Sequence, residues 1–194
     1  NIRVISNACI SGVSAIVIAR RMILSGVCDN AVVVGVDTQN RFITSGFASF
    51  KSLDGEVCRP YDASRCGLNL GEACGTILLT RNRLSDSDVA ISGGAITDDA
   101  NHISGPSRTG DGLYFAMRRA MDEAGVIPQQ LAMLQMHGTA TAYNDEMESK
   151  AASLAGLQDV PAQSLKPYFG HTMGASGVIE TIIAAEELKR GVCA

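Results

Sequence analysis

The chain has 194 residues, of which 46% are hydrophobic and 19% charged, so it carries enough apolar material for a buried core and we expect no disorder. Its formal net charge of −4 at pH 7 provides no basic field for a polyanion, which argues against a nucleic-acid partner. No stretch reaches the roughly 18 consecutive apolar residues of a membrane span, so we expect no span. The 20 glycines and the absence of tryptophan are typical of a tightly layered α/β protein.

The cysteines contain no C-x-x-C pair, and their intervals match neither a zinc site nor a disulfide framework. The six are Cys9, Cys28, Cys58, Cys66, Cys74 and Cys193. We therefore expect a reduced, cytoplasmic protein with no metal site. The sequence has no initiator methionine and stops abruptly at Ala194, so we also expect it to be a fragment.

The first part of the chain begins with a short apolar run over residues 2–6, which predicts a strand that leads into a turn at Cys9. Apolar residues at helical spacing predict a mostly buried helix over 11–25, ended by Gly26. The continuous β-branched run over 31–36 predicts a strand covered on both faces. A loop region with Phe42, Phe47 and Phe50, a strand over 74–80 and a polar linker over 82–87 follow.

In the second part of the chain, predicted strands again alternate with predicted helices. It is expected to contain a strand over 89–96, a helix over 111–125, a strand over 131–136, a helix over 145–155 and a last helix from about 174 to 189. Strands that alternate with helices at this spacing predict a layered α/β fold with a largely parallel sheet.

Cys9 lies where a predicted strand turns into a helix. A helix N-terminus offers unpaired N–H groups and partial positive charge, which favour a thiolate and a neighbouring oxyanion. The residues alone leave open the commoner role of a cysteine, which is to fill a gap in the core.

His137 follows a predicted strand at its carboxyl end, the edge where open α/β sheets bind ligands. His171 stands in a glycine-rich loop that leads into a helix. That loop lacks the spacing of a phosphate-binding G-x-x-x-x-G-K-[ST] motif, so the phosphate interpretation is weak. Two of only three histidines, each beside glycine and threonine, favour a shared site.

Glu148 and Lys166 are the next candidate residues for the site that the two histidines share. A carboxylate and an ammonium near two imidazoles would set their protonation and orientation. From spacing alone, two solvated surface charges are the simpler interpretation. Residue types at this level permit nucleophilic acyl transfer.

Four motifs resemble those of β-ketoacyl-acyl-carrier-protein synthases, and they occur in the same order. They are NACISG over residues 7–12, RPYDASRCG over 59–67 with GEACG over 71–75, HGTAT over 137–141 with Asp145 and Glu148 beyond it, and KPYFGHTMGASG over 166–177. Together they span nearly the whole chain, so the chain is identified as a member of that family, of the elongating Cys-His-His type.

The resemblance implies a thiolase-like α-β-α-β-α sandwich built from two related halves. Residues 1–81 would be the latter part of the first half, with the nucleophile, and residues 88–194 most of the second half, with both catalytic histidines. Relative to the family, the opening strands and helices and a closing Gly-Phe-Gly segment would be absent.

The resemblance also implies residue roles. Cys9 would accept an acyl group from a phosphopantetheine thioester, and His137 and His171 would stabilise the enolate as malonyl thioester loses carbon dioxide. Lys166 and Glu148 would be a supporting ion pair. Substrate-binding roles are implied for Thr139, Thr141, Ser104 and Phe47, the first three on the pantetheine arm and the last in the acyl tunnel.

No metal or dissociable cofactor is implied, because phosphopantetheine arrives on the acyl carrier protein. The implied partners are that carrier, acyl and malonyl thioesters, and a second subunit in a homodimer or heterodimer.

Three departures from the family pattern occur. Cys74 replaces a glycine, residues 165–169 are less polar than usual around the lysine, and residues 143–148 resemble synthases of aryl-polyene or flexirubin-like pathways. The rivals are a thiolase or an initiating synthase, which use Cys-His-Cys or Cys-His-Asn sets, and a non-catalytic partner that shapes chain length. The His171 motif argues against the first two, and Cys9 argues against the third.

Overall fold

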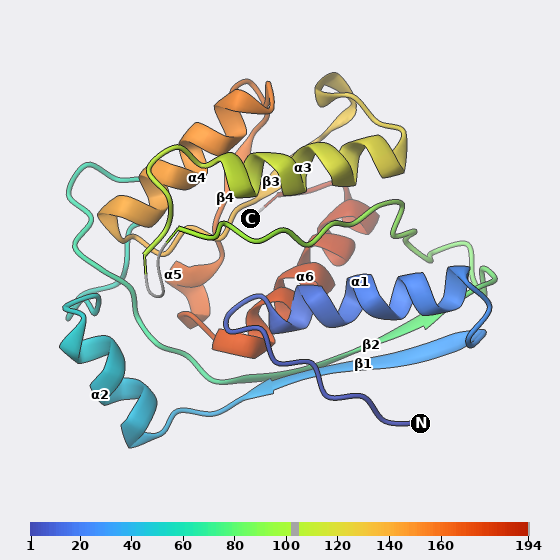
Figure 1. The fold of residues 1–194 in the computed structure, drawn as a ribbon, viewed down its shortest axis with the longest axis horizontal. Helices are drawn as coiled ribbons and strands as arrows, with labels where there is room; N and C mark the ends of the chain where they lie inside the picture. Colours follow the sequence, from blue (N-terminus) through green and yellow to red (C-terminus); the bar gives the residue numbers. More distant parts are fainter. Residues whose placement is uncertain (102–104, 194) are drawn as a thin grey trace. The chain divides into compact units, whose positions relative to one another are not determined.

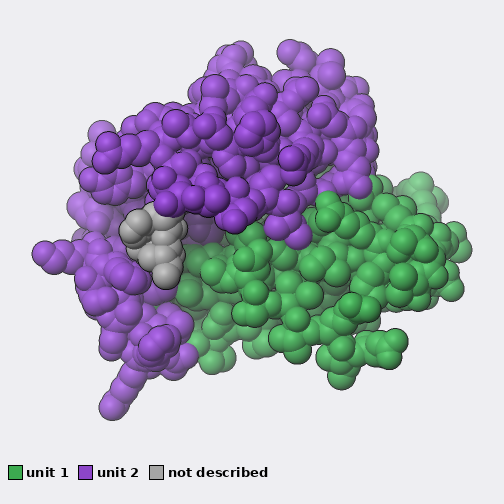
Figure 2. All heavy atoms as spheres, in the orientation of Figure 1, with its two compact units in different colours: residues 1–39, 70–91, 171–194 green, residues 40–69, 92–170 purple. Residues whose placement is uncertain are grey.

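The computed structural model describes residues 1–101 and 105–193, and its contacts divide the chain into two compact units (Figure 2). Unit 1 consists of Asn1–Gln39, Leu70–Ile91 and His171–Ala194, and unit 2 of Asn40–Asn69 and Ser92–Gly170. The expected division into related halves, 1–81 and 88–194, stays a prediction, because a grouping by contacts records compactness and not relatedness.

Unit 1 contains a two-stranded antiparallel sheet and two long helices (Figure 1). Its elements are α1 (Ser11–Leu24), β1 (Asn30–Asp37), β2 (Ala73–Thr80), the 3-10 turn η2 (Met173–Ala175) and α6 (Ser176–Arg190). The register runs from Asn30 opposite Thr80 to Asp37 opposite Ala73. The predicted helices over 11–25 and from about 174 to 189, and the predicted strands over 31–36 and 74–80, are confirmed within a few residues. The largely parallel sheet expected from the alternating pattern is wrong here, because β1 and β2 run antiparallel.

One face of this sheet carries the core of unit 1. Both α1 and α6 pack on it, and Ile16, Ala19, Val33 and Val178 are buried between them (Figure 1). The opposite face is open: Val32, Val34, Val36 and Leu78 are 56–65% exposed. Neighbouring residues of a strand point to opposite faces, so only alternate residues of the β-branched run are covered. The expectation of burial on both faces is therefore wrong.

Unit 2 is organised around two helices that pack on each other and a short parallel pair of strands. Its elements are α2 (Arg41–Ser49), α3 (Asp111–Ala124), η1 (Pro128–Gln130), β3 (Leu134–Gln135), α4 (Ala142–Leu154), β4 (Ala162–Gln163) and α5 (Lys166–Phe169). The buried residues of its core are Met121, Met136, Ala152, Ala155 and Leu157. Both helices predicted for this region are confirmed, although α4 begins three residues earlier.

Two of the predicted strands do not form, and a third is much shorter than predicted. Residues 2–6 and 89–96 form no strand, and Ile2 and Val4 are 95% and 89% exposed. A strand is defined by hydrogen bonds to a neighbour, which local apolar pattern does not supply. The predicted strand over 131–136 is likewise reduced to Leu134–Gln135.

The predicted loop around Phe47 is instead the helix α2. Asn40 caps it, because its side chain accepts a hydrogen bond from the N–H of Ile43 at 3.0 Å. Among the described residues, no helix is both long and apolar enough to cross a membrane.

Candidate active site

Cys9 lies immediately before α1 in unit 1. The turn that presents it contains Ala8 at φ +46°, a left-handed conformation that is strained for a residue with a Cβ. Ser11 closes the turn, since its hydroxyl donates to the Ala8 carbonyl at 2.6 Å and accepts from the Asn7 N–H at 2.8 Å. The side chain of Cys9 is half-buried. A partly accessible sulfur just before the N-terminus of a long helix suits a nucleophile better than a core filler.

His171 is also in unit 1 and is 1% exposed. Its Nδ1 atom accepts a hydrogen bond from the backbone N–H of Met173 at 3.3 Å and lies 3.0 Å from the hydroxyl of Ser176. A backbone N–H is always a donor, so Nδ1 is unprotonated and a neutral imidazole carries its proton on Nε2. The loop after it is fixed by Asp37 at the end of β1, which accepts from the Gly174 N–H at 3.0 Å.

His137 lies in unit 2, directly after β3, in a loop that two buried carboxylates of α4 hold. Glu148 accepts from the His137 N–H with Oε1 at 2.6 Å and from the Gly138 N–H with Oε2 at 2.9 Å. Asp145 accepts from the Thr139 N–H at 3.0 Å. The two acids stand three residues apart on one helix face, so one element satisfies three consecutive N–H groups. Each acid is less than 5% exposed, so the surface-charge interpretation of Glu148 is wrong.

Lys166 contacts the imidazole of His137 directly. Its side chain is 1% exposed, and its Nζ atom lies 3.4 Å from the Nδ1 atom of His137. A lysine ammonium has only donors, so Nδ1 of His137 must accept, and the proton of the neutral ring is then on Nε2. Lys166 therefore sets the tautomer of His137 as Met173 sets that of His171.

The same loop requires glycine at position 138. Gly138 has φ +46°, and a Cβ there would lie 2.6 Å from the Cβ of Ser164. The hydroxyl of Ser164 lies 2.9 Å from the Gly138 carbonyl oxygen, to which it donates. The close approach lets Ser164 hold the carbonyl side of the loop while Glu148 holds the N–H side.

The structure describes three of the four substrate-binding candidates. Thr139 and Thr141 point their hydroxyls at each other, 2.8 Å apart, and Phe47 is a half-buried residue of α2. Ser104 lies outside the described residues. The structure thus brings together His137, Lys166 and Glu148 in unit 2, whereas Cys9 and His171 belong to unit 1. That Cys9 lies beside either imidazole stays a prediction.

Sequence reasoning missed Tyr61 and Ser176 as members of the site, and it placed Asp145 in the motif of His137 without assigning it a role in the site. Tyr61 donates its hydroxyl to Glu148 at 2.5 Å and its N–H to Asp145 at 2.8 Å. The three-residue spacing between Asp145 and Glu148 places both acids on one helix face, so this spacing could have identified Asp145 from the sequence. Tyr61 gave no such signal, because its partner lies 87 residues away in the sequence.

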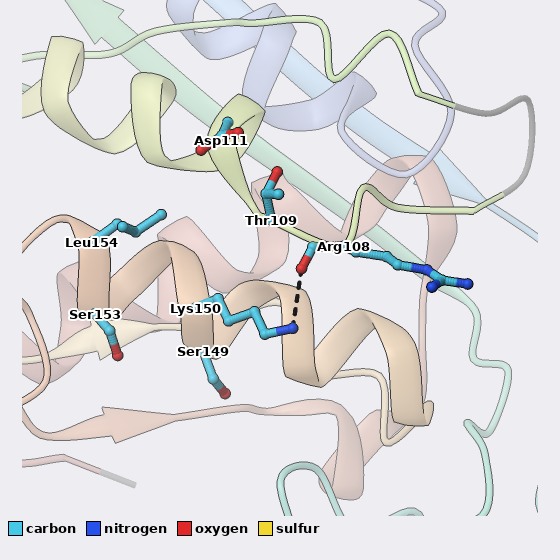
Figure 3. Close-up of a pocket in the computed structure, with 7 residues that line it drawn as sticks. All are labelled: Arg108, Thr109, Asp111, Ser149, Lys150, Ser153 and Leu154. Atoms are coloured by element: carbon cyan, nitrogen blue, oxygen red, sulfur yellow. Dashed lines mark hydrogen bonds between the residues drawn. The ribbon is translucent and has the colours of Figure 1, made fainter.

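A separate pocket of about 760 Å³ lies beside α4, and none of the candidate residues lines it (Figure 3). Lys150 donates to the Arg108 carbonyl at 3.0 Å and pairs with Glu146 at 2.6 Å, while the Arg108 side chain extends away from the other labelled side chains. Asp111 adds a negative charge, so this pocket has no excess positive charge with which to hold an anion. No cluster of three or more potential metal-ligating side chains occurs within residues 1–101 and 105–193.

Two family models match the chain. The model described as beta-ketoacyl synthase, N-terminal domain, matches residues 3–86, and the one described as beta-ketoacyl synthase, C-terminal domain, matches residues 89–194.

Curated relatives include 3-oxoacyl-[acyl-carrier-protein] synthase 2 of Vibrio cholerae, which is 33% identical over 95% of this chain and 48% of that protein. A putative mitochondrial 3-oxoacyl-[acyl-carrier-protein] synthase of Schizosaccharomyces pombe is 31% identical over 96% of this chain and 48% of that protein. The chain thus spans about half the length of the curated relatives it matches.

Solved structures agree with the sequence matches. The ketosynthase ApeO of Xenorhabdus doucetiae, solved with its chain length factor ApeC, superposes with a TM-score of 0.91 at 36% identity, covering 96% of this chain and 46% of that chain. A beta-ketoacyl synthase of Burkholderia phymatum gives a TM-score of 0.88 at 28% identity, covering 95% and 48%. The expected α/β fold of the thiolase-like ketosynthases is confirmed.

Proposed function

Because the chain belongs to the β-ketoacyl synthase family, we propose that the protein to which it belongs is a 3-oxoacyl-[acyl-carrier-protein] synthase that uses Cys9, His137 and His171. The observation that carries the proposal is the state of the two imidazoles. Both have Nδ1 occupied as an acceptor, so both offer an Nε2–H donor. Two neutral donors match a reaction in which negative charge develops on a carbonyl oxygen.

The first half-reaction loads Cys9. Its thiolate attacks the carbonyl carbon of an acyl thioester on the carrier protein and forms the new carbon–sulfur bond. The bond from that carbon to the carrier's sulfur breaks, and the carrier's thiolate leaves and takes up the proton that the Cys9 thiol gave up. The N-terminus of α1, and the backbone N–H of Cys9 itself, support the oxyanion of the tetrahedral intermediate.

The second half-reaction forms the carbon–carbon bond. The bond between the malonyl α-carbon and its free carboxylate breaks, carbon dioxide leaves, and the electron pair becomes an enolate whose oxygen accepts the two Nε2–H groups. The enolate carbon attacks the Cys9 thioester, the Cys9 sulfur leaves as thiolate, and a 3-oxoacyl thioester remains on the carrier. Lys166 and Glu148 keep His137 in place throughout.

The partners follow from this chemistry. An acyl carrier protein brings both thioesters on phosphopantetheine, and Thr139, Thr141 and Ser104 are the proposed contacts to that arm, with Phe47 at the acyl chain. No further cofactor and no metal is required by these steps. We propose a cytoplasmic homodimer or heterodimer, and the solved pair of a ketosynthase with its chain length factor supports the heterodimer.

The pathway is fatty-acid or polyketide synthesis, with aryl-polyene synthesis as the narrower proposal. The resemblance of residues 143–148 to synthases of aryl-polyene pathways supports this direction. The tunnel around Phe47 sets the length of the acyl chain, which assays with carrier proteins of different acyl length measure.

The test is whether an acyl group is transferred to Cys9. The native-length protein is incubated with acyl-carrier protein, digested and analysed by mass spectrometry, and we expect the acyl mass on the peptide that contains Cys9. Cys9→Ala should abolish the adduct. Cys66→Ala, which removes an exposed thiol, should leave it unchanged. An adduct that follows Cys66 instead of Cys9 would refute the proposed nucleophile.

A further inference from the structure

Tyr61 has a backbone conformation that an aromatic residue rarely adopts. Its φ is +65°, in the left-handed region, although neither neighbour in the sequence requires this. Such a conformation persists only where surrounding contacts fix it, and clusters of this kind occur at functional sites. The contacts that fix Tyr61 therefore indicate what the residue does.

Those contacts are the two carboxylates of α4. The N–H of Tyr61 donates to Oδ2 of Asp145 at 2.8 Å, and its hydroxyl donates to Oε2 of Glu148 at 2.5 Å. Asp145 is 1% and Glu148 4% exposed, so water does not compete for these oxygens. A short O–H···O⁻ bond to a buried carboxylate is among the strongest hydrogen bonds of proteins.

The oxygen atoms that Tyr61 contacts belong to the groups that hold the loop of His137. Oε2 of Glu148 accepts from both the Tyr61 hydroxyl and the Gly138 N–H, and Oε1 accepts from the His137 N–H. A carboxylate with three donors in fixed directions has one orientation. If the Tyr61 hydroxyl is lost, only the two backbone N–H groups still hold Glu148, so the carboxylate and the loop of His137 that it holds can shift together.

We propose that Tyr61 is a positioning residue for His137, acting through Glu148 to keep the imidazole Nε2–H aimed at the developing enolate oxygen. The inference rests on the proposed function, because the enolate belongs to that reaction. The hydroxyl stays a donor over the whole working range of pH, since burial and the neighbouring carboxylate charge both raise the pKa of Tyr61.

The test is Tyr61→Phe in the native-length protein, which removes one oxygen atom and keeps the ring. Tyr114→Phe is the matched control, because Tyr114 packs against the same core cluster as Tyr61 and no hydrogen bond of its hydroxyl is found among the described residues. For release of carbon dioxide from malonyl-carrier protein, Tyr61→Phe should lower kcat roughly 10- to 100-fold with KM unchanged, as a misplaced catalytic group does. Tyr114→Phe should keep both constants.

Two further measurements distinguish a positioning role of Tyr61 from a purely structural role. Activity is compared at a temperature at which thermal unfolding shows both variants to be folded, because Tyr61→Phe leaves the buried Glu148 carboxylate one donor short. The imidazole nitrogen resonances of His137 should shift in Tyr61→Phe alone, since the loop moves while Lys166 still contacts Nδ1. A folded Tyr61→Phe protein with wild-type kcat and unchanged His137 resonances would overturn the inference. If the wild-type protein releases no carbon dioxide, the proposed function fails, and the resonance measurement still decides whether Tyr61 positions His137.

Discussion

The phenol of Tyr61 differs from the other three tyrosines in its surroundings. Burial, the charge of Glu148 and the hydrogen bond to Glu148 all raise the pKa of Tyr61. In contrast, Tyr143 and Tyr168 are 77% and 73% exposed. In an alkaline titration of the folded protein, followed by phenolate absorbance, Tyr61→Phe should therefore remove none of the signal before unfolding.

The same shift makes stability depend on pH. An unfolded tyrosine ionises near pH 10, whereas Tyr61 in the folded protein keeps its proton to higher pH. The unfolded state therefore binds fewer protons above about pH 10, and the free energy of unfolding should fall as pH rises through that range. Urea unfolding at increasing pH should show a shallower fall for Tyr61→Phe, and an identical slope in the two proteins would contradict the assignment.

Gly138 is a second residue whose identity the site requires. Gly138→Ala places a Cβ at φ +46° and 2.6 Å from the Cβ of Ser164, so we expect a loss of about 2–4 kcal/mol in stability, or displacement of the His137 loop. Gly156→Ala is the matched control: its φ is +74°, and the nearest atom to a Cβ there is 3.8 Å away. Gly156→Ala should cost only the strain, about 1–2 kcal/mol, in a urea titration. Equal losses for the two variants would show that the contact with Ser164 is unimportant.

At the scale of elements, the same substitution on the two faces of β1 should change the free energy of unfolding by different amounts. Val33 is 5% exposed and Val34 56% exposed, although they are neighbours. Val33→Thr buries a hydroxyl and should cost about 1–3 kcal/mol, whereas Val34→Thr should change the free energy of unfolding by less than about 0.5 kcal/mol.

Val34→Thr should also reduce self-association of the 194-residue chain, because Val32, Val34, Val36 and Leu78 form an open apolar surface. Light scattering as a function of concentration measures this, with Val33→Thr as the comparison. Self-association that is unchanged in Val34→Thr would show that the open face of the sheet is not the associating surface.

Elements with a strong local pattern were predictable from the sequence. The helical spacing before Gly26 placed α1, and the β-branched run placed β1. Residues 2–6 have a comparable apolar pattern and still form no strand, since pairing depends on a neighbour elsewhere in the chain. The helix α2 was missed because its cap is a single side chain, Asn40, in a stretch of mixed residues.

At the scale of the whole molecule, the motifs predicted candidate site residues but not how the fold holds those residues. Cys9, His137 and His171 were identified from short motifs. Contacts such as that of Tyr61 with Glu148 join segments 87 residues apart, which no local pattern encodes. The burial of Lys166 was likewise unpredictable, because spacing alone favours a solvated lysine.

The division of labour between Cys9 and the histidines leads to a prediction for the complete reaction. In the proposed mechanism, condensation needs the Cys9 sulfur, whereas release of carbon dioxide needs only the Nε2–H groups of His137 and His171. Cys9→Gln in the native-length protein should therefore form no 3-oxoacyl product and still release carbon dioxide from malonyl-carrier protein. His137→Ala and His171→Ala should each lower carbon dioxide release by about 10²–10³, the usual loss for one oxyanion donor.

Both products have to be measured on the same samples, carbon dioxide by trapping and 3-oxoacyl-carrier protein by mass spectrometry. Cys66→Ala serves as the control, since Cys66 is an exposed thiol outside the proposed site, and it should keep both activities. Loss of carbon dioxide release in a folded Cys9→Gln protein would mean that the sulfur takes part in decarboxylation, and the separation of roles between the sulfur and the imidazoles would then have to be abandoned.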